Sequence, residues 1–500
     1  MTATAAHTGR LGLAGLCLLL LAAGCTTLPA PDSAQAECLR LYQQTERVLT
    51  ASGARPSSPA AIRGFPYYRV NRFLAAFRQQ ELDQAATDYW LQQLGQQEQD
   101  SRQIALRGLS DAQRARLPYP VGQLNQTLAQ CQQTLRQFDL AHPERLAQLR
   151  QRAVVADDYV TAARIVGLYP LFSIPVRAGI KKLHAEFRQR FALPLEQLPV
   201  LGQVLRYQPE QAPPAPQTTS APLKRDQLGI PRPDPQQLQA LLLRHAPVWE
   251  IDVAAAYDRP GRPVWRSPDG AQPVPTVDTS KALTFYYPSY SWWQGQPVLQ
   301  LNYLIWFDQR PLEGPFDILG GALDGVLWRV TLGPDQQPLL YDSIHACGCY
   351  HLFFPTPALR LRATALQLPE PPLAAQTAPI LHAGQQLVIR LASATHYLER
   401  VYAATATSSK TTQTYQLLDY AALYQTPSDK STNGKSANRN LFNAEGLVSG
   451  TERAERLLLW PLGVAEPGAM RERGRHAVAF VGRRHFDDAD LLDTLFEPAN

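Results

Sequence analysis

The chain has 500 residues, of which 45% are apolar and 18% charged, a balance typical of a folded protein. This length exceeds what one hydrophobic core usually supports, so we expect two domains. The formal net charge of +5 is small for the length and gives no support to nucleic-acid binding, so we expect no nucleic-acid partner. Because prolines number 42, we expect many loops and short strands beside the helices.

The first 24 residues have the pattern of a secretory signal peptide. Arg10 precedes an uncharged apolar run over residues 11–22, which is shorter than the roughly 20 residues that a membrane-spanning helix needs. The run leads into Leu21-Ala22-Ala23-Gly24-Cys25, which resembles the lipobox of bacterial lipoproteins. Leu21 stands one place further from the cysteine than the usual lipobox leucine. The resemblance implies cleavage before Cys25 and lipidation of its thiol and amine.

The same resemblance implies a location. Several acyl chains on one cysteine suffice for stable membrane anchoring. Thr26 stands where an aspartate commonly retains Gram-negative lipoproteins in the inner membrane, so the resemblance implies the outer membrane if the host is Gram-negative. We therefore expect an envelope protein that is held on the membrane by lipid.

Residues 25–207 are expected to form a helical domain. Apolar side chains recur three and four places apart, as at Leu39 and Tyr42. Cys38 and Cys131 both fall in such helical patterns, and an exported protein can oxidise its thiols. We predict a disulfide between Cys38 and Cys131, which would close a long loop.

Residues 160–180 are the most apolar stretch after the signal segment. Two arginines and two prolines interrupt the stretch, so we expect no membrane span: Arg164, Pro170, Pro175 and Arg177. A buried helix is the first interpretation. An interfacial helix is the second, because the basic residues that follow would suit acidic headgroups: Lys181, Lys182, Arg188 and Arg190.

Residues 208–226 hold five prolines among small and polar residues and are expected to form a linker. After it, residues 227–500 contain short runs rich in Tyr, Trp, Val and Ile, such as 298–307 and 326–332, separated by turn residues. This pattern predicts a β-rich, mainly antiparallel domain. The expected fold class is α+β, with the helical domain first.

Residues 345–351 carry four potential metal ligands at every second position: His345, Cys347, Cys349 and His351. An extended strand would spread these side chains over roughly 20 Å, so one shared site requires a turn, which Gly348 could supply. Three interpretations stay open. In the first, some of these residues bind zinc or copper, and His476, His485 or Asp487 completes the ligand set. In the second, Cys347 and Cys349 form a disulfide. In the third, all four are buried structural residues.

Two further clusters have a structural and a functional interpretation. Residues 470–488 are rich in arginine and histidine, which either pair with nearby acids or bind anionic lipid or glycan. Residues 286–307 hold eight aromatic side chains, which either fill a sheet core or line a glycan groove.

Neither a serine nucleophile in a glycine elbow nor a His-Glu-x-x-His helix occurs in the sequence. The sequence therefore favours a membrane-anchored envelope lipoprotein with a binding or structural role, and with an envelope protein or a glycan as partner. The alternative is a metal-dependent or thiol-based enzyme that uses residues 345–351.

Overall fold

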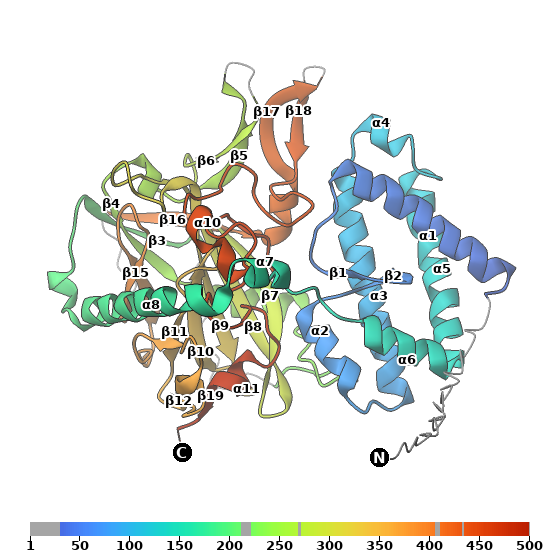
Figure 1. Ribbon diagram of the computed structural model, residues 1–500, viewed down its shortest axis with the longest axis horizontal. Helices are drawn as coiled ribbons and strands as arrows, with labels where there is room; N and C mark the ends of the chain where they lie inside the picture. Colours follow the sequence, from blue (N-terminus) through green and yellow to red (C-terminus); the bar gives the residue numbers. More distant parts are fainter. Residues whose placement is uncertain (1–30, 212–221, 269–271, 406–410, 433–434, 500) are drawn as a thin grey trace, which may run out of the picture.

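The computed structural model describes residues 31–211, 222–268, 272–405, 411–432 and 435–499. The expected signal segment 1–24, the lipidation site Cys25 and the central part of the expected linker lie outside these residues. Figure 1 shows two bodies side by side, a helical body that begins at the N-terminus and a larger β body. The α+β fold class, with helices before a mostly antiparallel β domain, is confirmed.

The helical body packs its helices around a short β-hairpin. The hairpin consists of β1 (Ala60–Ile62) and β2 (Phe65–Val70). The helical elements are α1 (Ser33–Ser52), α2 (Arg72–Ala76), η1 (Phe77–Gln79), α3 (Gln84–Arg107), α4 (Asp111–Arg114), α5 (Val121–Ala141) and α6 (Pro143–Arg152). The side chains of Asp32 and Asp83 cap the first turns of α1 and α3, which fixes where these helices begin.

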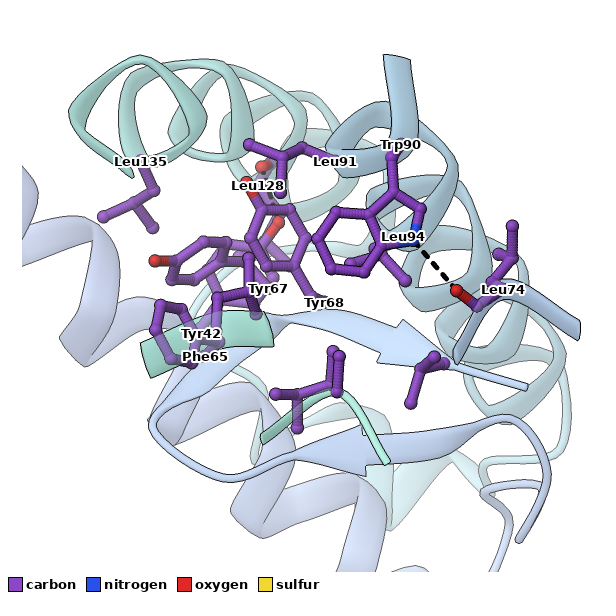
Figure 2. Close-up of a cluster of buried hydrophobic side chains, with 14 of the residues drawn as sticks. Tyr42, Phe65, Tyr67, Tyr68, Leu74, Trp90, Leu91, Leu94, Leu128 and Leu135 are labelled. Atoms are coloured by element: carbon purple, nitrogen blue, oxygen red, sulfur yellow. Dashed lines mark hydrogen bonds between the residues drawn. The ribbon is translucent and has the colours of Figure 1, made fainter. Parts of the chain in front are cut away.

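The core of the helical body contains a group of aromatic side chains among its leucines (Figure 2). Tyr67 and Tyr68 of β2 are fully buried against α3 and α5, and their ring centroids lie 4.5 Å apart. The indole N–H of Trp90 donates to the carbonyl oxygen of Leu74 at 3.0 Å, so this buried polar atom is satisfied. The predicted disulfide between Cys38 and Cys131 is confirmed and joins α1 to α5.

The β body is built on an eleven-stranded sheet in the described part of the chain. In sheet order its strands are β13 (Leu373–Ala374), β11 (Leu352–Pro355), β10 (Pro338–His345), β9 (Gly321–Leu332), β8 (Gln296–Arg310), β7 (Leu283–Trp293), β16 (Thr412–Asp419), β3 (Gln203–Pro209), β4 (Val248–Val253), β14 (Gln385–Leu391) and β15 (Leu398–Thr405). Most neighbours pair antiparallel, and the central meander from β7 to β11 is entirely so.

Smaller elements surround the sheet. A four-stranded sheet contains β5 (Arg262–Arg266), β6 (Val274–Asp278), β17 (Thr426–Thr432) and β18 (Lys435–Arg439), and a two-stranded one contains β12 (Leu359–Leu361) and β19 (Phe496–Pro498). The helical elements are α7 (Thr161–Val166), α8 (Tyr169–Ala192), η2 (Leu195–Gln197), α9 (Pro235–Arg244), η3 (Ala256–Asp258), η5 (Ala365–Gln367), η6 (Tyr420–Gln425), α10 (Arg456–Leu459), η7 (Trp460–Leu462) and α11 (Leu491–Leu495).

Along β8 and β9 the sheet is buried on both faces, and β8 shows how its sequence achieves this. Its alternate residues enter two different cores, Tyr303 and Ile305 on one face and Leu304 and Trp306 on the other. The aromatic cluster of residues 286–307 is therefore mainly core, as the structural interpretation holds. An exposed glycan groove made of the whole cluster is not formed.

The boundary between the two bodies differs from the expected one at residue 207. Phe187 and Phe191 of α8 enter the core of the β body, and β3 pairs with β4 and β16 near the middle of the sheet. The pattern of α8 is helical, which placed it with the preceding helices in the expectation, but its buried face packs on the sheet. The helical body therefore ends near residue 155.

The first interpretation of residues 160–180, a buried helix, is wrong. Ile165 is 71% exposed and Ile174 is 66% exposed, whereas of the α8 residues between them only Ser173 is buried. Among the described residues, no helix is both long and apolar enough to cross a membrane.

Aromatic packing and ion pairs hold the two bodies together. Phe73 of α2 lies against Tyr290 and Trp292 of β7, with ring centroids 5.5 and 5.8 Å away. Arg72 pairs with Asp158 at 2.8 Å and with Asp487 at 3.2 Å. The helical body is thus fixed both to β7 and, through Asp487, to the C-terminal segment.

Candidate functional site

A cavity of about 390 Å³ lies in the β body, between α8 and the loop that follows β10. Several separate parts of the chain supply its walls, among them Leu183 and Phe187 of α8, the loop 347–352, and residues 477–480 of the C-terminal segment. Most lining side chains are apolar. Binding sites for small molecules commonly occupy roughly 300 to 1,000 Å³ and have such linings with a few polar groups, so this cavity is the candidate site.

The loop after β10 makes a turn within residues 345–351, which a shared site of these residues would require. The backbone N–H of Gly348 donates to the carbonyl of His345 at 2.8 Å, and that of His345 donates to the carbonyl of Cys349 at 2.9 Å. Gly348 has φ +90°, and a Cβ there would lie 2.6 Å from the carbonyl oxygen of Ala477. Both the positive φ and the close contact require glycine at this position. The turn packs this loop against the C-terminal wall of the cavity.

The turn does not bring the two histidines to a common point. Nδ1 of His345 lies 3.2 Å from Oδ1 of Asp324, whereas Nε2 of His351 lies 2.9 Å from Oδ2 of Asp342. Burial lowers the pKa of His351 to about 4, although the neighbouring carboxylate acts in the opposite direction. At neutral pH His351 is therefore a neutral ring that donates to Asp342.

Asp342 is held ionised in turn by a third side chain. Burial alone would raise its pKa, but the guanidinium of Arg329 and the ring of His351 together hold that pKa below its usual value. Nε of Arg329 donates to Oδ1 of Asp342 at 2.9 Å. Arg329 faces Asp342 directly across the β9–β10 ladder, so the strand register assembles this buried pair.

Cys347 and Cys349 are free thiols that both line the cavity. The backbone N–H of Cys349 lies 3.4 Å from Sγ of Cys347. A side-chain hydrogen bond with Cys347, together with burial, raises the pKa of the Cys349 thiol well above its usual value. Cys349 is therefore protonated at neutral pH and is a weak nucleophile.

Over the described residues, no group of three or more His, Cys, Asp and Glu side chains is arranged to hold a metal ion. Of the four predicted ligands, the structure brings the two cysteines together and directs each histidine to its own carboxylate. A zinc or copper site built on all four stays a prediction that this arrangement does not favour.

Sequence reasoning missed the polar side chains that line the cavity: His184, Glu370, Glu455 and Arg484. Burial raises the pKa of Glu455 from 4.5 to about 7, against the effect of nearby arginines. Glu370 accepts the backbone N–H groups of Phe480 and Val481 at 2.7 and 2.9 Å and so fixes one wall. No local pattern links these residues, because they are far apart in the sequence.

A buried network behind the cavity was also missed. Nδ1 of His396 lies 2.9 Å from Oδ2 of Asp324, and Nε2 of the same ring lies 3.4 Å from Asp258. The ring of His396 stacks on Phe307 with centroids 3.9 Å apart. Burial lowers the pKa of His396, but the two carboxylates outweigh this effect and raise it. The network ties the loop after β14 to β9 and does not line the cavity.

The arginine-rich segment 470–488 is mostly paired within the molecule, as its structural interpretation holds. Nε of Arg471 donates to the carbonyl oxygen of Cys347 at 3.1 Å, and Arg475 pairs with Asp158 at 3.1 Å. His476 contacts the carbonyl oxygen of Ala346 through Nε2 at 3.2 Å. Arg471 and His476 thus support the loop 345–351, and none of these three side chains belongs to a free anion-binding surface.

Comparisons with protein-family models, with curated proteins and with solved structures found no match to this chain.

Proposed function

We propose that this chain is a lipid-anchored protein of the bacterial cell envelope whose β body binds a ligand with an apolar chain. The cavity under α8 carries the binding part of the proposal. It combines a size suited to a small molecule with a mainly apolar lining, and a few polar side chains stand among the apolar ones. An acyl chain with a polar end group matches this distribution.

The anchoring part rests on the lipobox resemblance at Cys25. Mass spectrometry of the N-terminal peptide, from protein isolated from bacterial membranes, tests it. We expect a peptide that begins at Cys25 and carries acyl chains, and we expect Cys25→Ser to abolish the modification. An unacylated peptide that begins at another residue would contradict lipidation. In a Gram-negative host, fractionation of the two membranes tests the expected outer-membrane location.

The binding part is tested by titrating the purified protein with a fluorescent fatty acid. Leu183→Trp places a larger side chain in the wall and is expected to weaken binding by about ten-fold or more, because ligand and indole compete for the same volume. Val200→Trp is the matched control, since Val200 is 52% exposed and lies outside the cavity lining. Equal binding by both variants, with unchanged thermal unfolding, would reject the cavity as the site.

A thiol-based or metal-dependent activity is the second candidate, because Cys347 and Cys349 lie together in the cavity wall. Metal analysis of the purified protein and of Cys347→Ser with Cys349→Ser tests the metal form. Zinc or copper bound at one ion per chain and lost in the variant would support it. A metal content that is low and equal in both proteins would remove it. An envelope protein or a glycan as partner stays a prediction.

A further inference from the structure

Exposed apolar side chains gather where α7, α8, α10 and η7 meet. In α7–α8 they are Ile165, Val166, Leu168, Leu171, Phe172 and Ile174, and in α10–η7 they are Leu457, Leu458 and Trp460. We call these nine residues the apolar face. Val166 is 75% exposed and Leu457 is 71% exposed, so these side chains lie on the surface and are not core residues with one exposed edge. Large clusters of this kind on a folded protein mark an interaction surface.

The two parts of the apolar face are fixed against each other, although they are far apart in the sequence. A Cβ on Gly167 would lie 2.5 Å from Cβ of Pro461, so the turn between α7 and α8 packs directly on η7. The N–H of Val160 donates to the carbonyl of Gly463 at 2.7 Å, and Nε of Arg164 donates to that of Leu462 at 2.7 Å. Figure 1 shows α7, α8 and α10 together on the outside of the β body.

The charge next to the α7–α8 part of the apolar face is mainly positive. Residues 160–192 contain six arginines and lysines but a single acid, Glu186. Arg177, Lys181 and Lys182 are exposed and follow the apolar half of α8 by one to two turns. The second half of α8 is held on the sheet by Phe187 and Phe191, whose burial keeps the helix in place.

We propose that the apolar face and the adjacent basic residues of α8 bind the surface of a lipid bilayer that contains anionic lipids. Leucine, isoleucine, phenylalanine and tryptophan on one side with lysine and arginine beside them are the composition of interfacial helices, which bury apolar side chains at the boundary of headgroups and acyl chains. The bases favour anionic headgroups by about 1 kcal/mol each, which is about five-fold in affinity. This inference rests on the proposed membrane location and names the surface of the protein that contacts the membrane.

The anchor and the face are separable by experiment. A chain that starts at Thr26 keeps every described element and lacks both the signal segment and Cys25. We expect this unacylated chain to float with vesicles of phosphatidylglycerol and phosphatidylethanolamine, and to bind phosphatidylcholine vesicles far less. Failure to bind the anionic vesicles would overturn the bilayer contact, whereas acylation of Cys25 is decided independently by the N-terminal peptide.

Two variants locate the contact. Lys181→Glu with Lys182→Glu is expected to lower anionic-vesicle binding by about 30-fold or more, and Ile165→Ser with Leu171→Ser by about 100-fold. The matched controls are Arg47→Glu with Arg63→Glu, and Leu201→Ser with Ile380→Ser, which change exposed side chains outside the apolar face. Controls that lose binding as strongly as the variants would overturn the assignment.

A second copy of the chain is the competing occupant of the apolar face. Sedimentation of the unacylated chain distinguishes the two. A monomer that binds anionic vesicles supports the bilayer contact. A stable dimer that Ile165→Ser with Leu171→Ser dissociates, and that does not bind vesicles, would replace the bilayer by self-association. Circular dichroism melts of all variants confirm that each one is folded.

Discussion

Gly348 lies directly against Ala477, so that a Cβ on the glycine would stand 2.6 Å from the carbonyl oxygen of Ala477. The contact joins two walls of the cavity, one from the loop after β10 and one from the C-terminal segment. Gly348→Ala is therefore expected to destabilise the protein by about 2 kcal/mol or more, through both its left-handed backbone and the clash. Urea unfolding measures this change.

Gly384 provides the control for the backbone term alone. It has φ +79°, but a Cβ there would meet nothing within 4 Å. Gly384→Ala should cost only about 1 kcal/mol. Fatty-acid binding should fall in the Gly348 variant and stay unchanged in the Gly384 variant. Equal stability losses in the two variants would contradict the tight contact at Ala477.

Removal of the disulfide should destabilise the helical body. Cys38 and Cys131 are 93 residues apart in the sequence, so their bond closes a long loop and lowers the conformational entropy of the unfolded chain. In the chain-entropy model its loss costs about 4 to 5 kcal/mol. We expect Cys38→Ala with Cys131→Ala to unfold at lower urea concentration, and reductant to shift the wild type in the same direction. Two free thiols at these positions in the native protein would rule out the bond.

Glu455 should make stability depend on pH between 4.5 and about 7. In the unfolded chain this carboxyl loses its proton near pH 4.5, but in the folded chain it keeps the proton to about pH 7. The folded state therefore binds more protons in this window, and the contribution of Glu455 to stability decreases as the pH rises.

Glu455→Gln removes this titration. The variant should gain stability relative to wild type as the pH is raised from 4.5 to 7, by at most about 3 kcal/mol, and the difference should then level off. Thermal unfolding at half-unit pH steps measures it. Glu466→Gln, at a carboxyl with 44% side-chain exposure, is the control. Parallel pH profiles for wild type and Glu455→Gln would contradict the buried, protonated carboxyl.

Phe73 is expected to hold the helical body to the β body. It is 5% exposed and packs on Tyr290 and Trp292, so Phe73→Ala leaves a cavity at the junction and should cost about 3 to 5 kcal/mol. Phe316 is 92% exposed, and Phe316→Ala should change stability by less than about 0.5 kcal/mol. If the two variants unfold alike, Phe73 does not stabilise the junction.

Local patterns were sufficient for the fold class and for the Cys38–Cys131 bond, because both follow from helical periodicity and strand composition near each residue. The packing of α8 on the β body was not predictable, because the periodicity of α8 shows that it is a helix but does not reveal which body its buried face contacts. The exposure of residues 165–174 was missed for the same reason, since an apolar run does not show whether a partner covers it.

The candidate site was predicted only in part. The loop 345–351 and the role of Gly348 were recognisable from residue types, and both thiols of the loop, Cys347 and Cys349, line the cavity. The carboxylates that take His345 and His351 away from a shared site depend on strand pairing, of β9 with β10 for His345 and of β10 with β11 for His351. The opposite wall comes from α8 and from residues 477–480, and only tertiary packing brings these segments to the loop.

Photocrosslinking with a diazirine-bearing fatty acid tests the central claim, ligand binding in the cavity under α8, most directly. Peptide mapping should place the label in residues 180–187, 347–352 and 477–480, which line the cavity, and Leu183→Trp should reduce it. Unlabelled fatty acid should compete. Label that is absent from every segment that lines the cavity, or that Leu183→Trp leaves unchanged in a folded protein, would contradict the account.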